Sequence, residues 1–201
     1  MSLKTLKMKL VTTFYRRVVC YRRSFAVSQP IKFDPSIKFT LLTKEHLPLL
    51  ENCLSAKEIA NTKKSWERGH DCFALILSEN SQEKIVSFGW VATKNPFIDY
   101  LNCFVKLDDK TAYFYNHYTL PDYRKFGFHF QRVLATQYYY QELGFRHSFS
   151  VVAWENSEAL QAADKFGKDA IGVYHYWRLG IKSLYKAESW ISEPLPELIR
   201  Q

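Results

Sequence analysis

One stretch of the chain, residues 113–129, combines side chains that transfer protons with side chains that hold phosphate. Its first half reads as an extended aromatic strand and carries Tyr115, His117 and Tyr118. Histidine titrates near neutral pH and can act as a general base, while a tyrosine hydroxyl can donate a proton. His117 is therefore the candidate base and the two tyrosines are candidate donors. The alternative is that His117 only packs in the structure or lines a cleft.

The second half of this stretch is a cationic turn. Pro121 ends the strand, and Arg124, Lys125 and Gly127 precede a helix predicted over about Phe130–Leu143. The N-terminus of a helix presents backbone N–H groups and the positive end of the helix dipole, which together suit a phosphate or pyrophosphate. The turn is a candidate anion site, with a plain connecting loop as the alternative.

Strand geometry constrains which of these side chains can act together. Successive residues of a regular strand point to opposite faces, so Tyr115 and His117 are expected on one face and Asn116 and Tyr118 on the other. The sequence does not say which face is the functional one. Glu155 is a second candidate base, and an ordinary carboxylate at the start of a helix is its alternative.

The elements that must position these residues mix strands with helices, which predicts an α/β or α+β sheet with some parallel pairing. Asn156 is expected to cap the last helix, which runs to Phe166. The remaining helices are predicted from Thr43 onward and over 56–66, and the strands over 37–42, 72–78, 84–92, 100–105, 111–120, 148–153 and 172–179.

Two segments together resemble the GCN5-related N-acetyltransferase (GNAT) superfamily. Arg124-Lys125-Phe126-Gly127-Phe128-His129 matches the first four positions of the family's Arg/Gln-x-x-Gly-x-Gly/Ala motif, and His129 stands where a small residue is expected. One strand and one helix later, Asn156-Ser157-Glu158-Ala159 and Lys165-Phe166-Gly167 look like the family's Asn-x-x-Ala and Lys-Leu-Gly-Phe segments. The resemblance covers about residues 37–180.

The resemblance implies a GNAT fold: a central mixed, mostly antiparallel sheet flanked by helices. Its parallel strands, here Thr111–Leu120 and Ser148–Ala153, would splay apart around an acyl-CoA co-substrate, without a metal. Backbone N–H groups near Tyr118–Leu120 would stabilise the oxyanion. The residues implied to bind the co-substrate are Tyr118, Thr119, Leu120, Arg124, Lys125, Phe126, Gly127, Phe128, His129 and Asn156.

The resemblance also implies an activity, the transfer of an acyl group, most simply acetyl, to a primary amine of a small molecule. The segments 68–73 and 88–90 look like a GNAT subgroup that occurs with bacterial surface-polysaccharide synthesis, which favours an amino sugar as acceptor. Many members use a tyrosine as proton donor at the position of Ala163. The alternative is an inactive GNAT-like domain that binds CoA, a lipid-linked partner or another protein.

Charge is concentrated at the start of the chain. Residues 1–25 hold seven basic and no acidic side chains, and the rest of the chain holds 21 basic and 20 acidic ones. A nearly neutral body argues against nucleic-acid binding. Leu and aromatic residues at three- and four-residue steps predict that residues 1–29 form a basic amphipathic helix. Such a helix could lie on a membrane surface, serve as a mitochondrial transit peptide, or pack against its own domain or a second subunit.

The remaining organisation is a linker over 30–36, the GNAT-like domain over 37–182 and a C-terminal tail over 183–201. Four widely spaced cysteines and the absence of an Asn-x-Ser/Thr site fit a reducing compartment, so we expect a cytoplasmic protein, with membrane association or a mitochondrial location as alternatives. No apolar stretch approaches the roughly 20 residues of a membrane-spanning helix.

Overall fold

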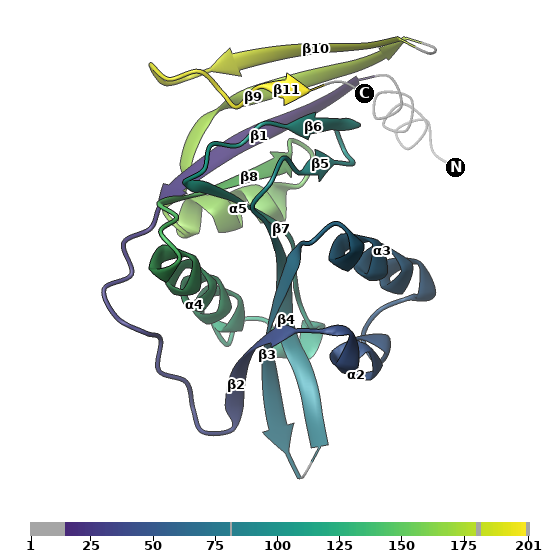
Figure 1. Ribbon diagram of the computed structural model, residues 1–201, viewed down its shortest axis with the longest axis vertical. Coiled ribbons are helices and arrows are strands. Elements are labelled where there is room, and N and C mark those ends of the chain that lie inside the picture. Colours follow the sequence, from purple (N-terminus) through teal and green to yellow (C-terminus); the bar gives the residue numbers. More distant parts are fainter. Residues whose placement is uncertain (1–14, 81, 180–181, 200–201) are drawn as a thin grey trace. The chain divides into compact units, whose positions relative to one another are not determined.

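A computed structural model describes residues 15–80, 82–179 and 182–199 of the chain (Figure 1). These residues fall into two compact units that each combine segments distant in the sequence. Unit 2 comprises residues 24–94 and 109–148, and unit 1 comprises the described residues before 24, those over 95–108 and those from 149 onward. The predicted boundaries at residues 37 and 182 do not coincide with this division.

Unit 2 contains four strands in the order β7-β4-β3-β2, and each neighbouring pair is antiparallel. Figure 1 shows α3 and α4 on opposite sides of these strands. The strands are β2 (Ile37–Leu42), β3 (Asp71–Glu79), β4 (Gln82–Ala92) and β7 (Thr111–Thr119). The helices are α2 (Leu47–Glu51), α3 (Ala56–Glu67) and α4 (Phe128–Glu142), with short 3-10 helices at Lys44–His46 and Pro121–Tyr123.

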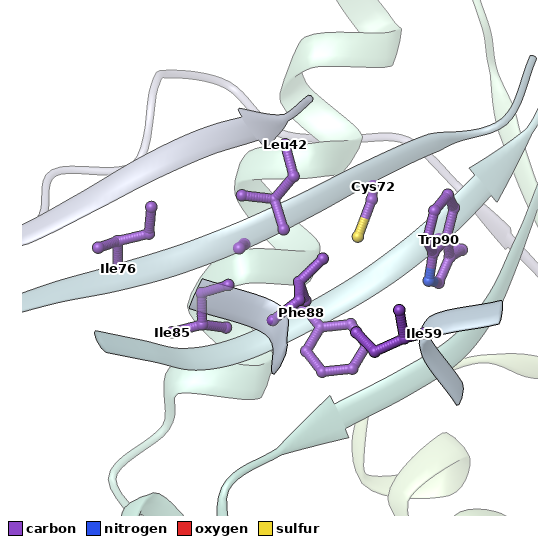
Figure 2. Packing of buried hydrophobic residues seen from close by; sticks show 9 residues of the cluster. Leu42, Ile59, Cys72, Ile76, Ile85, Phe88 and Trp90 are labelled. Carbon is purple, nitrogen blue, oxygen red and sulfur yellow. The ribbon is translucent and has the colours of Figure 1, made fainter. Parts of the chain in front are cut away.

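The core of unit 2 follows from strand alternation. On β3, Cys72, Ala74 and Ile76 face α2 and α3, which contribute Leu50 and Ile59 to the same buried cluster. Figure 2 shows this cluster gathered against β3 and β4, with its other members Leu42, Ile85, Phe88 and Trp90. At roughly 25 cal/mol per Å² of apolar surface removed from water, such clusters are the main stabilising contribution to the fold.

The ends of α3 and the opposite face of β3 complete unit 2. Ser55 and Glu58 form a reciprocal capping box that satisfies N–H groups at the start of α3. On the other side of β3, Phe73 packs against the rings of Tyr139 and Tyr140 of α4. The Tyr140 hydroxyl also donates a hydrogen bond to Asp71, so α4 is fixed to the start of β3.

Unit 1 contains strands in the order β10-β9-β1-β8, of which β1 up to residue 23 and β8 from residue 149 belong to it, and a small sheet in the order β11-β6-β5. Helix α5 places Leu160 and Ala163 against Val19, Tyr21 and Val173 of the larger sheet. The larger sheet is built from β1 (Tyr15–Ser24), β8 (His147–Ala153), β9 (Asp169–Leu179) and β10 (Lys182–Ser189), and the small one from β5 (Phe97–Ile98), β6 (Cys103–Val105) and β11 (Leu198–Ile199). Helix α5 spans Ser157–Lys165.

The N-terminal prediction of an amphipathic helix is wrong over Tyr15–Ser24, which form strand β1. The run Val18-Val19-Cys20-Tyr21 is buried throughout, as is typical of a strand covered on both faces, and β-branched and aromatic residues favour strands. The three- and four-residue spacing of apolar side chains is therefore coincidental in this segment. The first half of the predicted helix lies outside the described residues.

The prediction of a C-terminal tail from residue 183 is also wrong over the residues of β10, which pair with β9 along the whole length of β10. The α+β class, with mostly antiparallel strands flanked by helices, is confirmed, as are the predicted elements from β2 to β9 within a few residues. Strand β7 belongs to unit 2 and residues 149–153 of β8 to unit 1, so the splay between them stays a prediction. No helix in the described ranges is long and apolar enough to cross a bilayer.

Candidate active site

Strand β7 contains a β-bulge in the middle of the stretch that carries the candidate acid and base. Along the β4–β7 pair, Trp90 lies opposite Tyr115 and Phe88 lies opposite Tyr118. A single residue of β4, Gly89, therefore faces two residues of β7, Asn116 and His117. Asn116 has a φ of 46°, a conformation that asparagine tolerates better than most residues. The bulge re-aims the side chains that follow it.

The bulge overturns the predicted grouping of side chains. Tyr115 and Tyr118 both pack against the cluster beneath α2 and α3, so they share a face. His117 instead contacts Arg132 of α4, on the opposite side. The prediction that Tyr115 and His117 lie on one face is wrong, because one extra residue in the strand reverses the alternation.

His117 belongs to a polar cluster centred on Arg132, which is 1% exposed. Arg132 Nη2 donates to Nδ1 of His117 at 3.0 Å and to Nδ1 of His129 at 3.3 Å. Its Nε donates to Oγ of Ser87 at 3.1 Å. Burial lowers the pKa of the Arg132 guanidinium to about 10, which still leaves it charged at neutral pH. Sequence reasoning did not single out this arginine, because the pattern of a helix does not show whether one of its cationic side chains is buried.

Gly89 makes room for the cluster. A Cβ at this position would lie 2.5 Å from Nη1 of Arg132 and 2.5 Å from Nδ1 of His117. Heavy atoms do not approach that closely, so any side chain here would displace both groups. Because Gly89 has no side chain, the guanidinium of Arg132 and the imidazole of His117 can pack against the backbone of β4 at the bulge.

On the other face, the Tyr115 hydroxyl joins a second polar group. It lies 2.6 Å from Nδ1 of His70 and donates to Oγ of Ser65 at 3.2 Å. Burial, together with the charge of Arg68, lowers the pKa of His70. The sequence identified Tyr115 as a donor but missed both partners, since they come from α3 and the turn before β3, at least 45 positions away.

The cationic turn joins the end of β7 to α4. Arg124 Nε donates to the backbone oxygen of Thr119 at 3.3 Å, and Arg124 and Lys125 are both exposed. Lys125 and Gly127 have φ values of 72° and 79°, and Gly127 is the N-cap of α4 without a side-chain cap. A Cβ at Gly127 would meet no atom within 4 Å, so the backbone here faces open space.

The other residues implied to bind the co-substrate lie around this turn. Phe126 is 67% exposed and stacks on Phe128, which packs over Tyr123. The backbone N–H of Leu120 donates to the oxygen of Val86 at 3.0 Å and is therefore engaged. His129 directs its Nδ1 to Arg132, as described above. Whether Tyr118 and Thr119 supply oxyanion donors stays a prediction.

Two predicted site residues belong to unit 1. Asn156 caps α5 as predicted, because its Oδ1 accepts a hydrogen bond from the Ala159 N–H at 3.1 Å. Glu155 accepts a hydrogen bond from the Tyr100 hydroxyl at 2.9 Å, and burial together with this bond raises the pKa of Tyr100 to about 12. Ala163 is 4% exposed and packs in the core. No group of three or more potential metal ligands occurs among the residues described.

Solved structures resemble this architecture at low sequence identity. A functionally unknown conserved protein from Staphylococcus epidermidis superposes with a TM-score of 0.55 at 10% identity, over 87% of this chain and 66% of the other. A tandem GNAT protein from the clavulanic acid biosynthesis pathway gives 0.54 at 10% identity, over 85% and 56%. A suspected GNAT acetyltransferase from Novosphingobium aromaticivorans gives 0.52 at 12% identity, over 80% and 62%.

These likenesses establish the fold, which is that of the GNAT acetyltransferases. The chain spans between 56% and 66% of the length of the three structures. No protein-family model and no curated protein sequence matches the chain.

Proposed function

We propose that the protein is an acyl-CoA-dependent N-acyltransferase, which transfers an acetyl group to a primary amine of a small molecule such as an amino sugar. The observation that carries the proposal is the turn over residues 124–127. In this GNAT fold it leaves a bulged strand and enters α4 with two exposed cations and a glycine N-cap whose backbone faces open space.

The turn fits the pyrophosphate of a CoA. Arg124 and Lys125 provide full positive charges, and the first turn of α4 adds backbone N–H groups and the positive end of its dipole. The exposed ring of Phe126 offers an apolar surface beside these charges. Bound acyl-CoA would supply an activated thioester, which an amine can attack once it is held close and deprotonated.

Proton transfer is proposed for the face of β7 that carries Tyr115. Its hydroxyl donates to Ser65 and therefore accepts from Nδ1–H of His70, which can replace a proton that the tyrosine gives up. The lowered pKa of His70 favours its neutral form near pH 7, and the lone pair on Nε2 of that form can accept a proton. Tyr115 and His70 are thus the proposed acid–base pair, and Tyr118 lies on the same face.

The test of binding is titration calorimetry with acetyl-CoA. We expect the double variant Arg124→Ala/Lys125→Ala to bind at least about tenfold more weakly, because it loses two charges at the pyrophosphate. The matched control is Lys63→Ala/Lys64→Ala, which removes the same charge from exposed positions on α3. Absence of binding to the unmodified protein, or equal losses in both variants, would contradict the proposed role of the turn.

A second candidate function is an inactive GNAT-like domain that binds CoA, a lipid-linked partner or another protein. The observation that favours it is Ala163, which is buried and has no hydroxyl where the resemblance leads us to expect a proton donor. A thiol-release assay with acetyl-CoA over a panel of amines, amino sugars included, separates the two. Release that depends on the amine supports the enzyme, and binding without release supports the inactive domain.

A further inference from the structure

Arg132 is a buried cation without a carboxylate partner in the described part of the chain. Its hydrogen bonds go to two imidazoles and one hydroxyl, none of which carries a negative charge. A buried charge is costly unless its donors are satisfied, and here the guanidinium makes three hydrogen bonds. The guanidinium offers a rigid fork of five N–H donors, and here it reaches three separate elements.

The direction of these bonds fixes the chemical state of His117. A guanidinium donates and never accepts, so the nitrogen that faces it must carry a lone pair and no proton. Nδ1 of His117 is that nitrogen, at 3.0 Å from Nη2 of Arg132. The proton of the neutral ring is then on Nε2. The same argument applies to His129, whose Nδ1 lies 3.3 Å from the same Nη2, and the two hydrogens of Nη2 match the two rings.

We propose that Arg132 is a positioning residue that clamps the bulge of β7 to α4 and holds His117 in its neutral Nε2–H form. His117 lies at the bulge, His129 in the first turn of α4 and Ser87 on β4, so one side chain links all three elements. The link between this clamp and catalysis rests on the proposed function. The clamp itself does not, because it follows from contacts within unit 2.

The clamp changes the role assigned to His117. Its Nδ1 is occupied by a cation, and a ring already protonated on Nε2 has no second lone pair with which to remove a proton. His117 is therefore a support for the bulge, and deprotonation of the acceptor amine falls to the pair on the opposite face, Tyr115 and His70. Gly89 is part of the same arrangement, since a side chain there would displace both the guanidinium and the imidazole.

The proposal is tested by nitrogen NMR of the histidine rings in the resting, full-length protein at pH 7.5. The spectrum distinguishes an acceptor nitrogen, a protonated nitrogen and a doubly protonated ring, and His117→Asn assigns the His117 signals. We expect the unmodified protein to show His117 with Nε2 protonated and Nδ1 as a hydrogen-bonded acceptor. A proton on Nδ1, or on both nitrogens, would overturn the proposal.

Variants then test whether Arg132 is the cause. Arg132→Met should abolish the acceptor signature of Nδ1, and Arg132→Lys, which keeps the charge but lacks the fork, should weaken it for at least one of the two rings. The matched control is Thr136→Val, at a buried position one turn along α4 whose hydroxyl bonds the backbone oxygen of Arg132. An unchanged His117 spectrum in the arginine variants, or an equal change in the control, rejects the clamp.

The two proposals can fail separately. The NMR measurement needs neither acyl-CoA nor turnover, so a protein that does not transfer acyl groups can still show the clamp. If Arg132→Met does not fold, the unmodified protein and Arg132→Lys still decide the outcome. Loss of acyl transfer with an intact clamp counts against the proposed function alone.

Discussion

At the scale of single residues, the two faces of β7 carry different kinds of chemistry. Tyr115, His70 and Ser65 form a partly buried chain of groups that can each donate or accept a proton. Arg132 and His117 form a cluster whose cation can only donate. The first arrangement suits proton transfer and the second suits rigidity, so the bulge separates a chemical face from a supporting face.

The lowered pKa of His70 leads to a prediction about stability. When the folded-state pKa of a histidine lies below its unfolded value of about 6.5, protons bind the unfolded chain more readily. The stabilising contribution is then fully present above pH 6.5 and is lost as the pH falls through the folded pKa. His70→Asn should therefore show a smaller loss of unfolding free energy between pH 7.5 and pH 5 than the unmodified protein.

Urea unfolding at the two pH values measures this difference. His175→Asn is a useful comparison, because burial and the charge of Arg17 also lower the pKa of His175, in unit 1. Each substitution should remove its own part of the acid sensitivity, and the effects should add because the residues share no partner. A His70→Asn protein as acid-sensitive as the unmodified one would show that this imidazole does not titrate as described.

At the scale of the elements, the pairing of β4 and β7 determines which side chains of β7 share a face. Hydrophobic patterning predicts both strands correctly, because alternating and continuous apolar runs are dictated by burial. A bulge leaves the apolar pattern nearly unchanged, since it adds a single residue where Asn116 is exposed. The sequence therefore predicts the strand that carries the site residues but wrongly groups His117 on one face with Tyr115.

Gly89→Ala is the substitution that tests this pairing. Its Cβ would lie 2.5 Å from both Arg132 and His117, so both side chains must shift and the hydrogen bond between them is disturbed. Overpacking of this kind costs about 1–3 kcal/mol. We expect a loss of that size in the free energy of unfolding, together with loss of the Nδ1 acceptor signature of His117.

The double variant Gly89→Ala/Arg132→Met provides the control. If the added methyl group acts by displacing the guanidinium, the cost of the pair should be smaller than the sum of the single costs, because the second change removes the group that clashes. Strict additivity would mean that Gly89 is needed for another reason, such as backbone geometry.

At the scale of the whole chain, the fold class and the succession of elements from β2 to β9 could be predicted, because each element carries its own periodicity and its own end signals. Asn156 as a helix cap is one example, and Gly127 before α4 is another. The position of the N-terminal segment could not be predicted, because strand β1 lies between β8 and β9, which follow it by more than 120 residues. Such long-range pairing leaves no local signal.

Because β1 is a central strand of the sheet in unit 1, the import and membrane interpretations of residues 1–29 can be tested by deletion. Deletion of residues 1–14 leaves every described strand intact, whereas deletion of 1–24 removes a central strand and the buried Val18, Val19 and Tyr21. Each buried side chain of this kind contributes about 1.5–3 kcal/mol, and the strands on either side would gain unpaired edges.

We therefore expect the shorter deletion to unfold cooperatively near the melting temperature of the full chain, and the longer one to lose its cooperative transition and bind a hydrophobic dye. Circular dichroism melts with dye fluorescence measure both. Binding to anionic vesicles, if it is a property of the first 14 residues, should disappear in the shorter variant without a change in melting. A longer deletion that still melts cooperatively would show that β1 is dispensable, and a transit peptide that spans residues 1–29 would then be compatible with the fold. With β1 required, any leader sequence in this chain must end before Tyr15, because a protein that discards its own central strand could not retain unit 1.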